Sequence, residues 1–127
     1  MRKIAIVMKR KPLAEGISMA LQKYRADGIK SCIINDYELT HAYFESIMPD
    51  AALIEISESG KYDAQYCIEL CRTAAMDFPE TKLILMCPDN DEKSIAAAIE
   101  AKKNDVISDF VFYDASMEYL VAKLCSV

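Results

Sequence analysis

Several residues that could do chemistry stand where short apolar runs of the sequence end. Lys9 and Arg10 follow the run Ile4–Met8, and Glu55 stands near the end of the run 51–56. A carboxylate beside a cation can form an ion pair, which contributes ~0–1 kcal/mol at a protein surface. The basic cluster precedes a helical pattern, and a helix N-terminus can help to bind an anion. We expect a solvated basic patch there rather than an anion site.

The other reactive residue types do not form a catalytic or metal site that can be recognised. Five cysteines lack any C-x-x-C pair, namely Cys32, Cys67, Cys71, Cys87 and Cys125. This odd set argues against a disulfide framework and favours buried, reduced thiols. Cys67 and Cys71 would need two further ligands to bind zinc, and the single histidine is His41. Gly60-Lys61 lacks the flanking glycine and hydroxyl residues of a phosphate-binding loop.

An alternation of apolar strands and amphipathic helices must position these residues. Continuous apolar runs are typical of parallel strands that are covered on both faces. The expected strands are 4–8, 31–34, 51–56, 83–87 and 110–113, and the expected helices begin at about Pro12, Glu38, Asp63, Asp89 and Ser116. Five βα units predict an α/β fold, a doubly wound five-stranded parallel sheet of flavodoxin-like type in the order 2-1-3-4-5. The carboxyl ends of the strands, where such sheets carry their sites, then meet at one edge.

The composition is that of a small domain with one core. Its 127 residues suit a single domain spanning 1–127, and 53% hydrophobic residues suffice for a buried core. A net charge of −5 argues against a general binder of nucleic acids or anionic membranes. The N-terminal apolar run is too short for a signal peptide or a membrane span, so we expect a cytoplasmic protein. The sequence leaves open whether the natural chain continues past Val127 into an output domain.

Three segments resemble one known family, the receiver domains of response regulators. Segment 49–56 has a Pro-Asp pair, four apolar residues and an acidic residue, which is similar to the third strand of receivers. Segments 69–72 and 78–80 resemble the third helix of the family and the approach to its fourth strand. The order and spacing fit over essentially all of the chain, although 101–109 is longer than usual. The resemblance implies a CheY-like receiver that serves two-component signal transduction and phosphorelay.

The resemblance also implies that the residues of the phosphorylation site have been replaced. Receivers end the first strand with two acidic residues that hold Mg²⁺, and Met8 and Lys9 stand at those positions. Glu55 stands at the phosphoacceptor position, and Cys87 replaces the Ser or Thr that contacts the phosphoryl group. Tyr113 stands where the family has a lysine. Of these positions only Phe110 keeps the residue type of the family, which has an aromatic switch residue there.

These replacements bear on what Glu55 does. Phosphoryl transfer to a carboxylate needs a divalent cation, and Mg²⁺ needs carboxylate ligands in near-octahedral geometry. Met8 and Lys9 supply none, so we expect neither a Mg²⁺ site nor phosphorylation. Glu55 is then either a built-in mimic of the phosphorylated aspartate or a strand-end residue paired with Lys9 or Lys11. Both interpretations predict a lysine side chain within salt-bridge reach of Glu55.

The sequence therefore predicts a degenerate receiver, or pseudo-receiver, that has no enzymatic activity and works through protein contacts. In the family, helix four, strand five and helix five meet partners, an output domain or a second copy. That face would here include Ile95, Ile99, Phe112, Tyr119 and Lys123. Because Cys87 is a weak donor, we expect the switch to be decoupled and Phe110 to be held by packing alone. Nucleic acid would be contacted only through a domain outside this sequence.

Two rival classes use related folds. A flavodoxin-like domain could bind a small anion or a cofactor, but 8–12 lacks the hydroxyl- and glycine-rich loop of flavin sites. A phosphotransferase-type module would need a cysteine nucleophile after the first strand, and Met8 stands there instead. Neither a cofactor nor a bound metal is predicted.

Overall fold

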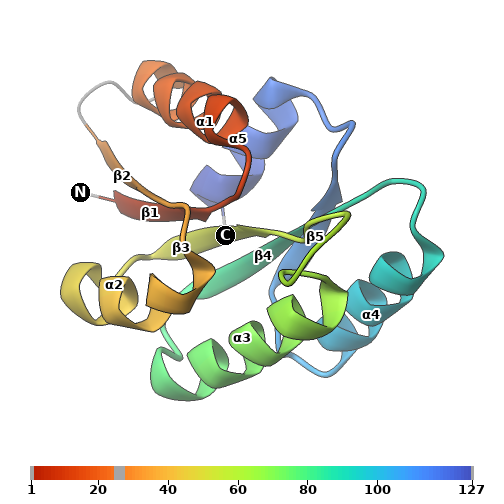
Figure 1. The fold of residues 1–127 in the computed structure, drawn as a ribbon. Helices are drawn as coiled ribbons and strands as arrows, with labels where there is room; N and C mark the ends of the chain where they lie inside the picture. The colour runs from red at the N-terminus through yellow and green to blue at the C-terminus, as the bar shows by residue number, and fades with distance from the viewer. Residues whose placement is uncertain (1, 25–27, 127) are drawn as a thin grey trace.

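The computed structural model describes residues 2–24 and 28–126. Val127, past which the sequence leaves open whether the chain continues, lies outside the described residues. Five parallel strands form one sheet in the order β2-β1-β3-β4-β5, as the sequence predicts (Figure 1). Their bounds are β1 Arg2–Val7, β2 Ile29–Ile34, β3 Ala51–Glu55, β4 Lys82–Cys87 and β5 Asp109–Phe112. Because the strands are parallel, their carboxyl ends lie along one edge of the sheet.

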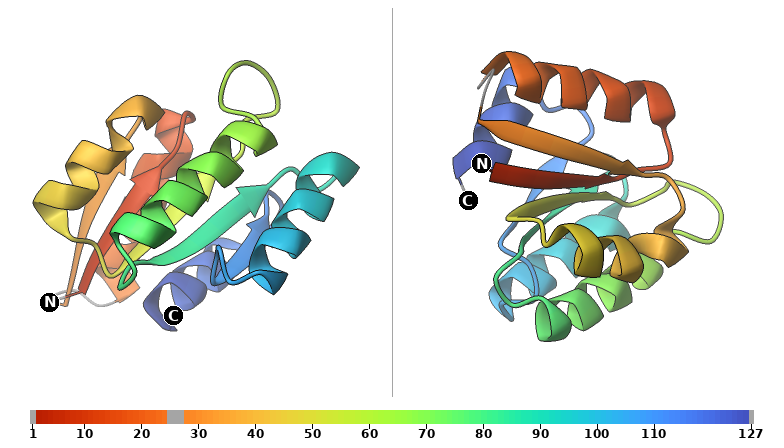
Figure 2. Two further views of the ribbon diagram at one scale, coloured as in Figure 1. Left: turned by 90° about the horizontal axis from the view of Figure 1, so that it is seen from below. Right: turned by 90° about the vertical axis from the view of Figure 1, so that its left-hand side faces the viewer.

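Helices cover both faces of this sheet. Their bounds are α1 Lys11–Tyr24, α2 Thr40–Ile47, α3 Ala64–Asp77, α4 Glu92–Lys103 and α5 Met117–Ser126, with a 3-10 helix at Tyr37–Leu39. Helices α1 and α5 lie on one face, and α2, α3 and α4 lie side by side on the other (Figures 1 and 2). The loop between β3 and α3 stands out from the edge at which the strands end (Figure 2).

The core consists of two layers, one on each face of the sheet. Alternation along the strands sends Ala52 and Ile54 of β3 toward α2, α3 and α4, and Leu53 toward α1 and α5. The central strands are buried on both faces, which explains why their sequences are apolar without interruption. The same alternation continues to the strand ends and decides toward which layer each residue of the site points.

Local capping accounts for most helix boundaries. Ser116 precedes α5 as predicted, and its hydroxyl accepts a hydrogen bond from the Tyr119 amide at 3.1 Å. The prediction that Asp89 starts α4 was wrong, because Asp91 occupies the N-cap and accepts from the amides of the second and third helical residues. Both aspartates precede the apolar stripe of α4, and only the chain geometry after β4 decides between them. No helix within residues 2–24 and 28–126 is long and apolar enough to cross a membrane.

Candidate functional site

Glu55 ends β3 and is the acidic residue at the centre of the site. It is only 1% exposed. Its Oε1 accepts hydrogen bonds from the backbone amides of Lys9 at 3.0 Å and Arg10 at 3.4 Å, and its Oε2 forms an ion pair with Arg10 Nε. A buried carboxylate needs such partners, because desolvation without them costs several kcal/mol.

The adjacency of β1 and β3 explains this geometry. The two strands pair up to Val7 and Ile54, so the turn after β1 passes directly beside Glu55. The prediction of a lysine partner was wrong, since Arg10 supplies the side chain and Lys9 supplies only its amide. The pair also differs from a surface ion pair, because its acid is fully buried while the Arg10 side chain is 47% exposed. Arg10 was visible in the sequence only as one member of a basic cluster.

Arg10 and Tyr113 form a second pair above the carboxylate. The Arg10 guanidinium carbon lies 4.3 Å from the centre of the Tyr113 ring, and its Nη2 lies 4.0 Å from the sulfur of Met86. The phenol of Tyr113 donates to the backbone carbonyl of Ile56. Burial, and then the charge of Glu55, raises the pKa of Tyr113 well above its ordinary value. The phenol therefore stays protonated and remains a donor at physiological pH.

Two further tyrosines close the other side of the site. The Tyr37 phenol donates to the backbone carbonyl of Glu55 at 2.6 Å, and burial raises its pKa far above the ordinary value. The Tyr62 ring stacks on Tyr37 with ring centres 4.2 Å apart and a 5° interplanar angle. The ammonium of Lys9 lies 5.9 Å from the centre of the Tyr62 ring and forms no ion pair with Glu55. Sequence reasoning missed these residues, because tyrosines at core spacing carry no signal of a site.

Met8 and Lys9, which stand where the resemblance places two Mg²⁺-binding acids, offer no carboxylate to such an ion. Met8 is fully buried, and its carbonyl accepts a hydrogen bond from the Asn35 amide group at 2.8 Å. Lys9 and Arg10 bring two cations to the place where Mg²⁺ would need anionic oxygens. Among residues 2–24 and 28–126, no group of three His, Cys, Asp or Glu side chains is arranged to hold a metal.

The two switch positions lie in the other layer of the core. Cys87 is buried in the cluster under α2, α3 and α4, where burial, and then the charge of Asp91, raises its pKa to about 12. Phe110 is half-buried against the same cluster and packs edge-on to Phe112 at 5.8 Å. Glu55 instead shares Arg10 with Met86 and Tyr113, which belong to the layer of α1 and α5. Thus the structure assembles Glu55, Lys9, Arg10 and Tyr113, whereas the side chains of Cys87 and Phe110 pack in the other layer of the core.

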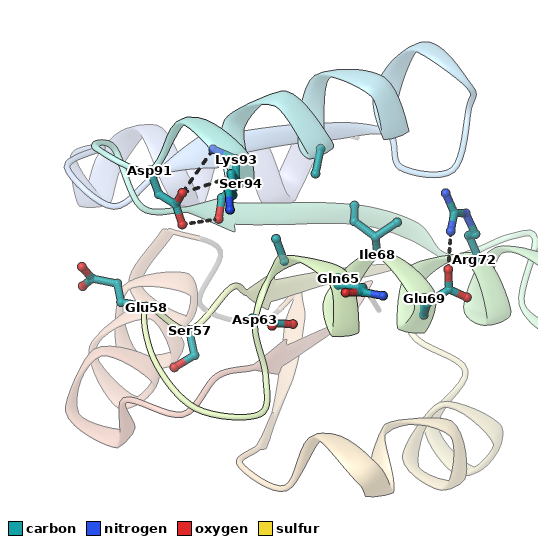
Figure 3. A pocket seen from close by; sticks show the side chains of 12 residues that line it. Ser57, Glu58, Asp63, Gln65, Ile68, Glu69, Arg72, Asp91, Lys93 and Ser94 are labelled. Carbon is teal, nitrogen blue, oxygen red and sulfur yellow. Dashed lines mark hydrogen bonds and ion pairs between the residues drawn. The ribbon is translucent and has the colours of Figure 1, made fainter.

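Two hollows lie near this edge of the sheet. A small one of about 190 Å³ is bordered by Lys9, Arg10, Glu55 and Tyr113 together with the loop 57–59. A larger one of about 580 Å³ lies between α3 and α4, and its polar side chains are shown in Figure 3. Charged side chains of this larger hollow interact within their own helices: Glu69 forms an ion pair with Arg72 of α3, and Asp91 caps the N-terminus of α4 (Figure 3). We therefore place the candidate site at Glu55 and not in the larger hollow.

Comparisons with known proteins identify the fold. No protein-family model matches the sequence, and no curated protein matches it. Among solved structures, a CheY-like response regulator receiver domain protein from Methanospirillum hungatei JF-1 is similar with a TM-score of 0.79 and 16% identity, over 98% of this chain and 91% of that one. The signal receiver domain of a signal transduction histidine kinase from Syntrophus aciditrophicus gives a TM-score of 0.79 and 16% identity, over 98% and 88%.

A third structure is longer than this chain. The response regulator DrrB, a Thermotoga maritima OmpR/PhoB homolog, gives a TM-score of 0.72 and 22% identity, over 96% of this chain and 50% of that one. At these identities the likeness establishes the fold, which is that of receiver domains, and leaves the function to be argued from the site.

Proposed function

We propose that this chain is a receiver-like signalling domain of the cytoplasm, in which an internal ion pair has replaced the phosphorylation site. One observation carries the proposal: the carboxylate at the phosphoacceptor position is already bound by Arg10 and by the amides of residues 9 and 10. An incoming phosphodonor would have to displace a charge-assisted contact inside a buried site. It would also meet Met8 and Lys9 at the positions where an acidic pair would bring Mg²⁺ to the transferring group.

The domain then acts as a non-enzymatic module that meets other proteins. Its best candidate surface is the face of α4, β5 and α5, which carries exposed apolar side chains: Ile99 is 51% exposed, Tyr119 is 50% exposed and Phe112 is exposed as well. Ile95 and Lys123 flank them and are half-buried. Exposed apolar groups clustered on one face are typical of protein interfaces. The chain covers half of DrrB, so a domain of this fold can be joined to a further domain, and we propose either an attached output domain or a second copy as the partner.

Asp109 pairs with two lysines on this face. Asp109 accepts from Lys102 of α4 at 2.9 Å and from Lys123 of α5 at 2.6 Å. Burial raises the pKa of Asp109, but the hydrogen bonds from Lys123 and Lys102 outweigh it and lower the pKa to about 2. These ion pairs hold α4 and α5 together across β5, so the apolar face is formed before any partner arrives.

The mimic of a phosphorylated aspartate remains a rival role for Glu55. Among the residues that the structure describes, every hydrogen bond to its carboxylate comes from residues 9 and 10, and none comes from Cys87. This favours the role of an ion-paired strand end. A cofactor site beside Glu55 gains no support, because the hollow there, of about 190 Å³, is smaller than the ~300 Å³ at which ligand pockets begin.

The test is incubation of the full chain with acetyl phosphate and Mg²⁺, followed by intact mass measurement. We expect no phosphoryl adduct, and an acid-labile adduct on Glu55 would overturn the proposal. Glu55→Gln tests the rival role: we expect the affinity for a partner or second copy to change by less than about threefold, ~0.7 kcal/mol. A loss of tenfold or more would establish the mimic instead.

A further inference from the structure

Tyr113 is fixed at three points where β5 passes into α5. Its amide donates to the carbonyl of Cys87 at 2.9 Å, its phenol donates to the carbonyl of Ile56, and its ring lies against Arg10. The residue before it, Phe112, belongs to the exposed face of β5. Tyr113 is thus anchored to the site at one end and to the interaction face at the other.

Arg10 is the group through which Tyr113 senses Glu55. The same guanidinium forms the ion pair with Glu55, lies on the Tyr113 ring and reaches Met86 of β4. A planar guanidinium can make an ion pair and a ring contact at once, which an ammonium group cannot do equally well. The Glu55 carboxylate and the Tyr113 ring thus contact the same guanidinium.

The layers of the core separate this connection from Phe110 of β5. Tyr113, Ala115 and Met117 pack against the cluster of α1 and α5. Phe110 packs against the opposite cluster, where its neighbours include Phe112 at 5.8 Å and the Lys102 ammonium at 5.9 Å from its ring centre. Side chains on opposite faces of a sheet respond to different neighbours.

We propose that the Arg10–Tyr113 pair couples the Glu55 site to the segment 113–120, which leads into α5, and that the side chains of Cys87 and Phe110 take no part in this coupling. The pair positions the loop between β5 and α5 and so sets the shape of the face. The meaning of this coupling rests on the proposed function, because it acts on the surface proposed to meet partners. Tyr113 and Arg10 are positioning residues here.

Amide hydrogen exchange in the full chain tests the coupling. The reporters are the amide of Ala115, which donates to Phe112, and the amide of Leu120, which donates to Ser116. In Tyr113→Phe we expect both to exchange about 3–10-fold faster, because the loop loses one of its anchors. The Lys82 amide, which donates to Asp50 at the far end of the sheet, should stay within about twofold and reports any global loss of stability.

Matched variants make the test specific. Arg10→Lys keeps the charge but removes the planar group, and we expect it to accelerate the same reporters, with no further gain in the double variant with Tyr113→Phe. Phe110→Leu changes the β5 aromatic that packs in the opposite layer of the core and should leave the exchange rates of both reporters unchanged. The proposal is overturned if Phe110→Leu accelerates the reporters as much as Tyr113→Phe does, or if neither Tyr113→Phe nor Arg10→Lys accelerates them.

Failure of this inference is distinguishable from failure of the proposed function. The exchange experiment uses neither a phosphodonor nor a partner, so unchanged reporters would refute the coupling and leave the proposed function standing. A phosphoryl adduct on Glu55 would refute the proposed function, whatever the exchange rates are. Should Tyr113→Phe fail to fold, Arg10→Lys alone decides the question with the same reporters.

Discussion

Replacing Arg10 by methionine removes the guanidinium from Glu55 but keeps an unbranched side chain of similar length. The carboxylate then remains buried with the amides of residues 9 and 10 as its hydrogen-bond donors and with no countercharge from Arg10. Breaking a fully buried ion pair destabilises a protein by about 3–5 kcal/mol. Here the arginine side chain is 47% exposed and both amides persist, so water replaces part of the lost interaction. We expect a loss of about 2 kcal/mol.

Urea denaturation followed by circular dichroism measures this loss as a lower free energy of unfolding. A change of about 2 kcal/mol corresponds to a fall of roughly 6–10 °C in Tm for a domain of this size. Lys11→Met is the matched control: Lys11 is an exposed neighbour at the start of α1, so its replacement should change the free energy by less than about 0.5 kcal/mol.

A double variant separates the ion pair from general packing. Arg10→Met with Glu55→Met removes both charges, and such replacements of buried pairs are often neutral or stabilising. We expect the double variant to be more stable than Arg10→Met alone, with a coupling energy of about 1–2 kcal/mol. The reasoning is refuted if Arg10→Met lies within about 0.5 kcal/mol of the wild type, since the buried carboxylate would then not depend on arginine.

Three further predictions concern other parts of the molecule. The pKa of Asp109 is lowered to about 2, so its two lysine partners stabilise the fold above the unfolded pKa of ~3.9, and this stabilisation is lost as the pH falls from about 4 to 2. Asp109→Asn should remove about 1 kcal/mol of the pH dependence of the free energy of unfolding in this range. An unchanged pH dependence would contradict the role of these ion pairs. Tyr37→Phe leaves the buried backbone carbonyl of Glu55 without the phenol that donates to it. We expect the free energy of unfolding, measured in urea, to fall by about 1–2 kcal/mol. A loss near zero would mean that water replaces the phenol as the donor. Ile99→Lys on α4 should weaken self-association at least tenfold, ~1.4 kcal/mol, as measured by sedimentation velocity. The control Met76→Lys changes an 81% exposed residue of α3 and should not weaken it. Equal effects of the two variants would reject the face of α4, β5 and α5 as the interface.

The order of the strands, and the edge of the sheet at which Glu55 and the turn after β1 meet, could be predicted because both follow from long-range rules. Uninterrupted apolar runs separated by helical patterns leave few topologies, and parallel strands must end along one edge. The identity of the partner of Glu55 could not be predicted in the same way. After β1 ends, strand alternation no longer fixes which side a residue faces, and a shift of one position decides between Lys9 and Arg10.

The tyrosines show a second limit of sequence reasoning. Tyr37 and Tyr62 come from different connections and meet only because β2 and β3 flank β1 in the sheet. A tyrosine at core spacing looks the same whether its phenol is free or bonded to a buried carbonyl, so the sequence carried no signal for them. The start of α4 at Asp91 instead of Asp89 has a comparable origin, since both residues satisfy the local pattern of an N-cap.

The central claim is that Arg10 occupies the place of the phosphorylation chemistry, and titration of the full chain with Mg²⁺ and beryllofluoride, followed by amide NMR, tests it most directly. The amides of Lys9 and Arg10 report on the site, because both donate to the Glu55 carboxylate. We predict no saturable shift of either amide up to about 10 mM Mg²⁺, with or without beryllofluoride, because Arg10 already holds the Glu55 carboxylate and neither Met8 nor Lys9 offers a carboxylate ligand for this ion. Saturable shifts of both amides with a dissociation constant near or below about 1 mM would contradict the account, since they would show that a cation enters where the structure places a guanidinium.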